Sequence, residues 1–220
     1  MHFIIINASP HTVSASNTAQ VIEAFQQGVI EENSTVETYH LSQKTHWEKS
    51  KLAFLNNENI VFALPVFAAT IPGYFMEFLE ELYSDVSKEQ KYSVKRNISF
   101  IIQSGFPEAC QRIYCENFLK TISKFLNSNF NGILSYGINV RFAIDQSWQS
   151  VLDSYKEMGS LFVKQNGNFF YKQAIDFNKP EYLSENEAKK FNRLFNFFCR
   201  QISEGRGCKV SLKDAPYEIK

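Results

Sequence analysis

The sequence has few of the residues from which phosphate-transferring loops and metal sites are usually built. Glycine accounts for only 9 of the 220 residues. Neither a Gly-rich turn ending in Lys nor a Gly-x-Gly-x-x-Gly pattern occurs, which excludes a nucleotide-hydrolysing P-loop and the usual dinucleotide fingerprint. The cysteines lack the spacing of a zinc site or an iron–sulfur run, so we expect reduced thiols and no metal. They are Cys110, Cys115, Cys199 and Cys208.

An excess of charge and long hydrophobic runs are also missing. Lys plus Arg and Asp plus Glu number 23 each, so no overall field attracts nucleic acid or an acidic membrane. No stretch approaches the roughly 20 apolar residues of a membrane span. The N-terminus enters a strand without the basic segment, apolar core and cleavage site of a secretory signal. We therefore expect a cytoplasmic protein with a small-molecule ligand and with neither a nucleic-acid nor a membrane partner.

Short apolar runs alternate along the chain with longer helical patterns. This alternation is typical of a parallel sheet whose two faces are both covered by helices. Right-handed crossovers then favour a three-layer, doubly wound α/β fold with five strands in the flavodoxin-like order 2-1-3-4-5. We expect this domain to span residues 1–166. The predicted strands cover residues 3–6, 36–41, 60–64, 98–102 and 133–140.

Apolar side chains at helical spacing predict the helices between these strands. Helices are expected to begin near residues 17, 72, 114 and 148, with a shorter one over 47–55. Residues 84–97 are polar and rich in Lys, which predicts a surface connection. In the third long helix we expect four side chains to face the core: Tyr114, Phe118, Ile122 and Phe125.

The last part of the chain, residues 167–220, follows a different pattern. It begins with many aromatics and continues with a helix announced by the capping box Ser184–Glu187 and ending near Gly205. We expect this C-terminal extension to pack back on the domain or to form a homodimer contact. The apolar face of its helix comprises Phe191, Leu194, Phe195, Phe198 and Ile202.

Residues 3–18, FIIINASPHTVSASNT, form an apolar strand that runs into a loop of Ser, Thr and Asn, which then opens a helix. The free N–H groups and positive dipole end of a helix N-terminus favour a phosphate. Because the loop holds no Lys and no metal ligand, it suits a phosphate that stays bound better than one that is transferred. The alternative is a solvated turn with Asn17 and Gln20 as a capping pair.

Two further loops, 64–72 and 103–108, follow the third and fourth strands. In a doubly wound sheet they meet the first loop at the carboxyl edge. Pro65 stiffens a loop that carries Phe67, and Gly105 allows close backbone approach beside Phe106. Such an apolar surface with backbone N–H groups suits a planar heteroaromatic ring. Alternatively, Phe67 and Phe106 only plug the end of the sheet.

These residues carry a family resemblance. Residues 7–10 (NASP) and 16–18 (SNT) are similar to the Gly-Ser-Pro…Ser-Asn-Thr phosphate loop of flavodoxin-like NAD(P)H-dependent FMN reductases and quinone reductases. Residues 65–67 with Pro72 resemble the Pro-x-Tyr…Pro second flavin loop of that family, and 104–108 its third. Ala8 replaces the usual Gly and Phe67 the usual Tyr.

The resemblance implies that FMN is the cofactor. By position, the phosphate would lie at Ser9, Ser16, Asn17 and Thr18. The ring would be bordered by Pro65, Val66, Phe67, Ser104, Gly105 and Phe106.

The family further implies an oxidoreductase that takes electrons from NADH or NADPH and gives them to a quinone, a flavin or a similar small acceptor. The flavin carries this chemistry, so no catalytic side chain is expected. The alternatives are a flavodoxin-type electron carrier and a flavodoxin-like scaffold protein without flavin. His40 is within reach of the site, and Arg112 and Arg141 are candidates for a nicotinamide phosphate. Each is otherwise expected to be an ordinary surface residue or, for His40, a core residue.

Overall fold

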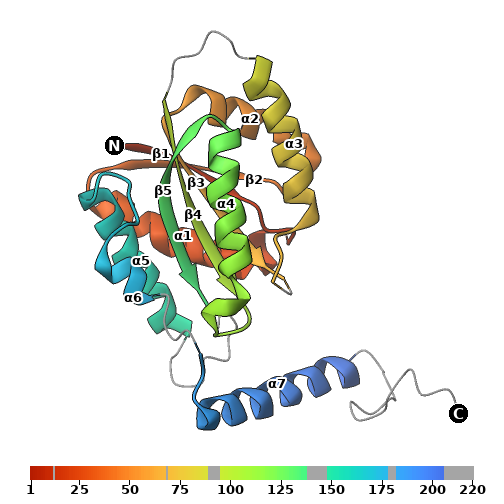
Figure 1. Cartoon of the computed structure of the whole chain (residues 1–220). Coiled ribbons are helices and arrows are strands. Elements are labelled where there is room, and N and C mark those ends of the chain that lie inside the picture. The colour runs from red at the N-terminus through yellow and green to blue at the C-terminus, as the bar shows by residue number, and fades with distance from the viewer. Residues whose placement is uncertain (12, 68, 89–94, 138–147, 178–181, 206–220) are drawn as a thin grey trace, which may run out of the picture. The chain divides into compact units, whose positions relative to one another are not determined.

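The computed structural model of the protein describes residues 1–220 except 12, 68, 89–94, 138–147, 178–181 and 206–220. The chain divides into two compact units, Met1–Tyr182 and Leu183–Lys220. The first unit contains a five-stranded parallel sheet of order β2-β1-β3-β4-β5, which confirms the flavodoxin-like fold (Figure 1). Its strands are β1 (His2–Asn7), β2 (Thr35–His40), β3 (Asn59–Val66), β4 (Arg96–Ser104) and β5 (Ser128–Tyr136).

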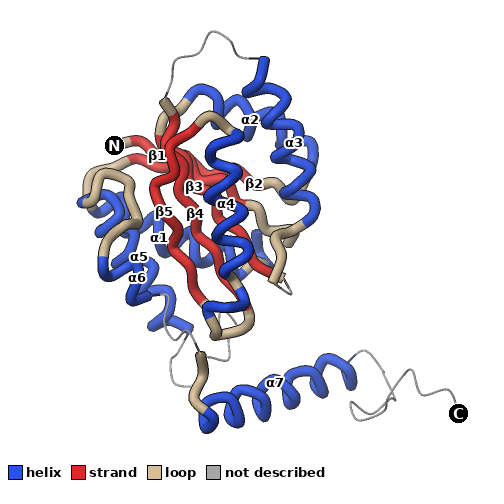
Figure 2. The backbone as a smooth tube through the Cα atoms, viewed as in Figure 1, coloured by secondary structure: helices blue, strands red, loops and turns tan. Residues whose placement is uncertain are grey.

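Helices cover both faces of this sheet, as the pattern of apolar runs predicted (Figure 2). One face is covered by α1 (Asn17–Glu31) and α5 (Trp148–Lys164), with the short α6 (Lys172–Phe177) beside β5. The other is covered by α2 (Trp47–Asn56), α3 (Gly73–Lys88) and α4 (Ile113–Phe125). Three single-turn helices lie in connections: η1 (Val13–Ala15), η2 (Lys44–His46) and η3 (Ala109–Gln111).

The connection expected over 84–97 is shorter than predicted. Helix α3 continues to Lys88, and β4 already begins at Arg96. Residues 89–94 lie outside the described part. The Lys-rich composition therefore marks the polar end of a helix as well as a connection, because a solvated helix face is polar in the same way as a loop.

The fifth strand begins earlier than predicted, at Ser128 instead of Ile133. Its first half is polar because asparagine side chains bond one another across three strands. Asn129 Nδ2 donates to Asn97 Oδ1 at 2.9 Å, and Asn97 Nδ2 donates to Asn59 Oδ1 at 3.3 Å. This amide ladder satisfies polar groups that hydropathy alone assigns to a loop. Residues 138–140 of the predicted strand lie outside the described residues.

Helix α4 buries a stripe that matches the predicted one only in part: Phe118 and Ile122 pack against the core as expected. Tyr114 and Phe125 are 77% and 58% exposed, so their expected place in the core is wrong. The buried residues are Cys115, Leu119 and Ser123. Ser123 can lie in the core because its hydroxyl donates to the Leu119 carbonyl at 3.1 Å. Because Ser123 is polar, hydropathy alone does not mark this row of residues as the buried face of the helix.

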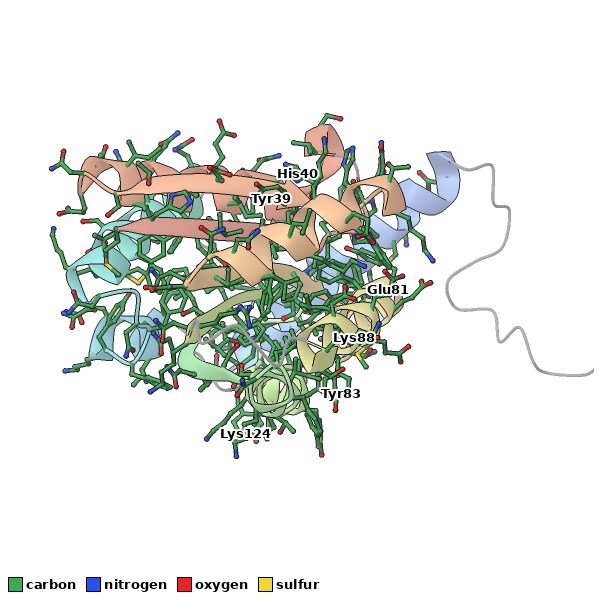
Figure 3. All side chains as sticks on the ribbon, turned by 90° about the horizontal axis from the view of Figure 1, so that it is seen from above. Tyr39, His40, Glu81, Tyr83, Lys88 and Lys124 are labelled. Atoms are coloured by element: carbon green, nitrogen blue, oxygen red, sulfur yellow. The ribbon has the colours of Figure 1, made fainter. Side chains whose placement is uncertain are left out.

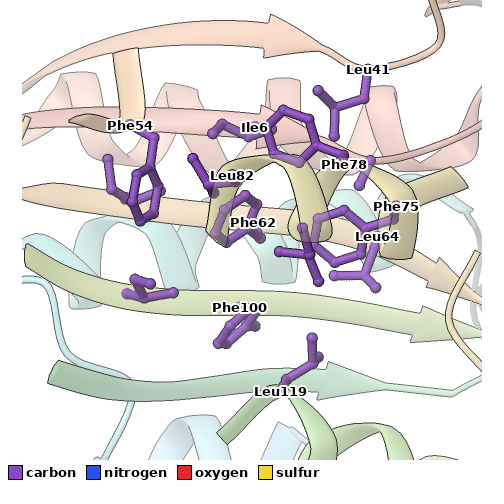
Figure 4. Close-up of a cluster of buried hydrophobic side chains, with 14 of the residues drawn as sticks. Ile6, Leu41, Phe54, Phe62, Leu64, Phe75, Phe78, Leu82, Phe100 and Leu119 are labelled. Carbon is purple, nitrogen blue, oxygen red and sulfur yellow. The ribbon is translucent and has the colours of Figure 1, made fainter. Parts of the chain in front are cut away.

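Phenylalanines dominate the core between the sheet and α3 (Figure 4). The ring of Phe62 stacks on those of Phe100 and Phe54, with centroids 5.8 and 6.0 Å apart, and it also meets Phe75 at 5.4 Å. All four side chains are fully buried. Such aromatic contacts fix β3 and β4 relative to α2 and α3, so the ends of these strands are held rigidly.

On the opposite face, α1 and α5 touch backbone to backbone. A Cβ atom built on Gly28 would lie 1.9 Å from the carbonyl oxygen of Lys156, and one on Gly159 would lie 2.1 Å from that of Phe25. Neither distance leaves room for a methyl group. Two glycines therefore permit the helix approach that holds α1 in place.

We predict that Gly159→Ala lowers the free energy of unfolding by about 2 kcal/mol, because the added methyl group forces the two helix backbones apart. Chemical denaturation measures this change. Gly73→Ala is the matched control, since a Cβ there meets nothing within 4 Å. Equal denaturation midpoints for Gly159→Ala and the unchanged protein would contradict the proposed packing.

The second unit is built on α7 (Glu185–Gly205), and its predicted capping box is confirmed. Ser184 N donates to Glu187 Oε2 at 2.9 Å, and Glu187 N donates to Ser184 Oγ at 3.4 Å. The first unit ends at Tyr182 and so includes the first residues of the expected C-terminal extension. Among these residues, Phe169 N donates to the Asn131 carbonyl of β5 at 2.9 Å. Within the described residues, no helix has both the length and the apolar character needed to cross a membrane.

Candidate functional site

The carboxyl ends of the strands bring the three predicted loops to one edge of the sheet. In the strand register, Asn7 lies beside both His40 and Ala63, while Gln103 lies beside both Pro65 and Tyr136. The loops that follow β1, β3 and β4 therefore start side by side. This edge is where doubly wound folds bind their ligands.

Two buried serines organise the first loop. Ser16 Oγ donates to Ser9 Oγ at 2.9 Å and accepts the N–H of Ala19 at 3.2 Å. Ser16 is thus the N-cap of α1, and the expected capping pair Asn17–Gln20 is wrong. A hydroxyl one residue earlier accepts from the third helical residue with the geometry that N-caps require.

The remaining donors of this loop suit a phosphate. Ser9 Oγ accepts from Ser16 and, at 3.3 Å, from the N–H of His11, so its own proton is left for a further acceptor. Thr18, whose side chain is buried, and half-buried Asn17 lie in the first turn, where N–H groups have no intrahelical acceptor. Hydroxyls and helix N–H groups together fit a monophosphate.

His40 lies at the end of β2 (Figure 3), and a chain of hydrogen bonds links it to this loop. Ser9 N donates to Asn7 Oδ1 at 2.9 Å, which leaves Asn7 Nδ2 to face His40 Nδ1 at 3.1 Å. This ring nitrogen can accept only while the imidazole is neutral. Burial lowers the pKa of His40, and nearby His46 lowers it further. His40 therefore positions the loop through Asn7.

Tyr74, on the first turn of α3, ties the same loop to the opposite helix layer. Its hydroxyl donates to the carbonyl of Ala8. Burial raises the pKa of Tyr74, so the hydroxyl remains a donor throughout the physiological range. No local motif marks a tyrosine that bonds to a carbonyl 66 residues away, so the sequence alone does not predict the role of Tyr74.

We predict that the first loop loses stability as the pH falls below 6.5, the ordinary pKa of histidine. Because the pKa of folded His40 is lowered, the unfolded chain binds the proton first. The contribution of neutral His40 to the free energy of unfolding is complete above pH 6.5 and is lost as the pH falls through the lower pKa of the folded state. Chemical denaturation of the protein and of His40→Gln, each at pH 8 and pH 5, measures this contribution. A pH dependence that is identical in the two proteins would contradict the assigned role.

Side chains of the second and third loops point outward. Phe67 and Phe106 are 46% and 38% exposed, so the alternative in which they plug the sheet is wrong. Phe67 and Thr70 exchange two backbone hydrogen bonds of 2.9 Å, which close a tight turn with Ala69 at a φ of 61°. Pro65 is half-buried beside buried Val66. The turn therefore presents the ring of Phe67 at the site edge.

The third loop is fixed from below by Arg112, which is fully buried. Its Nε donates to Ser135 Oγ at 2.8 Å, and its Nη1 lies 3.2–3.4 Å from three carbonyls of residues 106–108. Burial lowers the pKa of Arg112. Both expectations for this residue, a nicotinamide contact and a surface position, are wrong. Arg141 lies outside the described residues.

Buried Ser104 and half-buried Gly105 begin the same loop. Ser104 Oγ donates to the carbonyl of Phe106 at 2.6 Å. The preceding residue, Gln103, is 2% exposed, yet neither polar atom of its side chain has a hydrogen-bond partner within the described part of the protein. Buried amides are almost always hydrogen-bonded, so Gln103 has two donors and an acceptor to offer to a polar group at this edge.

An apolar cavity of about 440 Å³ adjoins the second loop. It has no charged side chain in its wall, and the Sγ of Cys115 donates to the Ala69 carbonyl at 3.3 Å. Burial raises the pKa of Cys115, which keeps the thiol protonated. No cluster of metal-ligating side chains occurs among the residues described. The lining residues are Ala69, Thr70, Ile71, Gly73, Met76, Tyr114, Cys115 and Phe118.

No protein-family model matches the sequence, and neither does any curated protein sequence. Solved structures share the fold. An NADPH-quinone reductase from P. pentosaceus is 17% identical with a TM-score of 0.55, over 72% of this chain and 98% of that protein. General stress protein 14 of Treponema denticola, in complex with FMN, is 12% identical with a TM-score of 0.55, over 74% and 98%.

An azoreductase from Bacillus anthracis is 12% identical with a TM-score of 0.53, over 75% of this chain and 99% of that protein. At these identities the likeness shows a shared fold. The activity has to be argued from the site itself. The structural neighbours of this chain are flavodoxin-like NAD(P)H quinone and FMN reductases and azoreductases.

Proposed function

We propose that the protein is an FMN-dependent NAD(P)H oxidoreductase that passes electrons to a quinone, a flavin or a similar small acceptor. The observation that carries the proposal is the meeting of three loops at one sheet edge. The buried Ser9–Ser16 hydroxyl pair lies at the N-terminus of α1, and the exposed rings of Phe67 and Phe106 follow β3 and β4. This combination provides a polar end and an aromatic end for one ligand.

The residues would divide the work of binding between them. Ser9, Asn17 and Thr18 would hold the phosphate with hydroxyl and N–H donors, and Ser16, whose hydroxyl donates to Ser9 Oγ, would orient the Ser9 hydroxyl. Bound FMN would supply the transfer of hydride from the nicotinamide to the acceptor, so the protein needs no catalytic side chain. The structural neighbour that contains FMN supports this cofactor. The ring would lie against Pro65, Val66, Phe67, Ser104, Gly105 and Phe106.

The cavity beside the second loop favours an uncharged acceptor. Its wall contains the aromatic rings of Tyr114 and Phe118 and the thioether of Met76, and only Thr70 and Tyr114 among its lining residues carry a hydroxyl. Its volume lies in the range of small-molecule pockets, and burying a charge there without a partner would be unfavourable. A neutral aromatic acceptor fits this wall. The homodimer and the cytoplasmic location stay predictions.

Titration with FMN tests the proposal. We expect added FMN to raise the melting temperature of the protein and to lose its fluorescence on binding. Anaerobic mixing of the complex with NADPH or NADH should then bleach the flavin absorbance much faster than it bleaches free FMN. Absence of binding would leave the scaffold alternative, whereas a bound flavin that neither nucleotide bleaches would indicate an electron carrier.

We further predict that Ser16→Ala combined with Asn17→Ala raises the Kd of FMN at least tenfold. Asn17 would lose a hydrogen bond to the charged phosphate, of the kind that contributes about 1.5–3 kcal/mol, and the Ser9 hydroxyl would lose the bond from Ser16 that orients it. Fluorescence titration measures the Kd. Ser184→Ala is the matched control, because it removes the hydroxyl that caps α7 and leaves the first loop intact. An unchanged Kd in the double variant would refute the phosphate assignment.

A further inference from the structure

We propose that Arg112 is a positioning residue for the flavin, which turns the β4–α4 loop so that its N–H groups face the ring and places a permanent positive charge beneath it. The inference rests on the proposed function. Arg112 is the last residue of the connection between β4 and α4, beyond the loop residues 103–108, and its side chain is fully buried. It acts through the loop backbone without touching the ligand.

Geometry carries the first part of the inference. Nη1 of Arg112 gathers the carbonyl oxygens of Phe106, Pro107 and Glu108 at 3.3, 3.4 and 3.2 Å. In a trans peptide the C=O and N–H bonds point in opposite directions. The N–H groups of Glu108 and Ala109, which share peptide planes with the second and third of these carbonyls, therefore point away from the guanidinium. Such donors suit the carbonyl and nitrogen edge of a flavin.

Neighbouring residues hold this arrangement from two further sides. Ser104 Oγ lies 3.3 Å from Nη1 and also donates to the Phe106 carbonyl. A Cβ on Gly137 would lie 2.4 Å from the Phe106 oxygen, 2.5 Å from the Pro107 oxygen and 2.6 Å from Nη1. The chain after β5 thus passes directly against the loop, and only glycine fits there. The carbonyls have no room to turn outward.

Charge carries the second part. A guanidinium stays protonated in proteins even when burial lowers its pKa. The interior screens its field less than water does, so the charge acts on groups across the loop. Uptake of two electrons and one proton makes a flavin ring anionic at its N1 and O2 edge. A buried cation under the loop that borders this edge would stabilise the reduced ring more than the oxidised one.

The protein offers a matched comparison in Arg96, which begins β4 at the opposite edge of the sheet. It is 2% exposed, and it donates to the carbonyls of Phe54 at 3.1 Å and Leu55 at 2.9 Å. Both arginines are buried and bind backbone carbonyls. Of the two, only Arg112 lies at the carboxyl edge. If both arginines only stabilised the fold, their variants would affect FMN binding in the same way, whereas a positioning role predicts an effect of the Arg112 variants alone.

The test compares Arg112→Gln, Arg112→Lys and Arg96→Gln in the FMN-loaded protein. Fluorescence titration gives the Kd of oxidised FMN, and equilibrium reduction by dithionite against a reference dye gives the midpoint potential. We expect Arg112→Gln to weaken oxidised FMN about tenfold and the reduced form a further tenfold, which lowers a two-electron potential by about 30 mV. Arg112→Lys keeps the positive charge and loses the planar set of guanidinium donors. The Kd of FMN should therefore rise in this variant, while the midpoint potential of the bound flavin stays near that of the unchanged protein.

Arg96→Gln should lower the melting temperature and leave both the Kd and the potential unchanged. The inference is overturned if Arg112→Gln binds oxidised and reduced FMN as the unchanged protein does, or if Arg96→Gln shifts the potential equally. Should Arg112→Gln fail to fold, Ser135→Ala and Gly137→Ala disturb the same contacts, and an unchanged Kd and potential in both would overturn it. An unchanged protein with no FMN affinity would instead refute the proposed function and this inference together.

Discussion

Burial of both faces of the parallel sheet is the constraint from which the other features of this protein follow. Successive residues of β1, such as Ile4, Ile5 and Ile6, point to opposite faces, and all are inaccessible to water. Helices must therefore cover both sides, and each strand must return through a crossover. All strands then end at the same edge, which brings three loops from distant parts of the sequence together. The ligand edge is a geometric result of how the apolar surface is covered.

The fold could be predicted from the sequence wherever side chains are apolar on both faces or regularly amphipathic. The prediction failed where polar residues satisfy one another. Asn97 and Asn129 form strand positions because their amides bond across the sheet. Ser123 occupies a core position because it bonds within its own helix. Hydropathy records that a residue is polar and does not record whether its hydrogen bonds are met inside the protein.

The loops of the candidate site could be predicted from the sequence. The residues that hold these loops in place could not. Local motifs mark Ser9, Ser16 and the aromatic loops because a turn or a helix start has a short sequence signature. The residues that hold these loops lie far away along the chain. Asn7 and His40 are separated by 33 positions, and Arg112 and Ser135 by 23. Such pairs exist only once the strands have been placed side by side.

The contact between Gly28 and the backbone of α5 also has a consequence for the timing of folding. The two helices are adjacent in space, yet the carbonyl that Gly28 meets belongs to Lys156. During synthesis, α1 leaves the ribosome long before this partner exists, and Phe25 and Val29 on its inner face pack in the core that α5 completes. Helix α1, which begins at the first loop, therefore completes its packing only after α5 has been made. A nascent chain that stops short of α5 would carry the residues of the first loop without the helix contact that holds α1 in place.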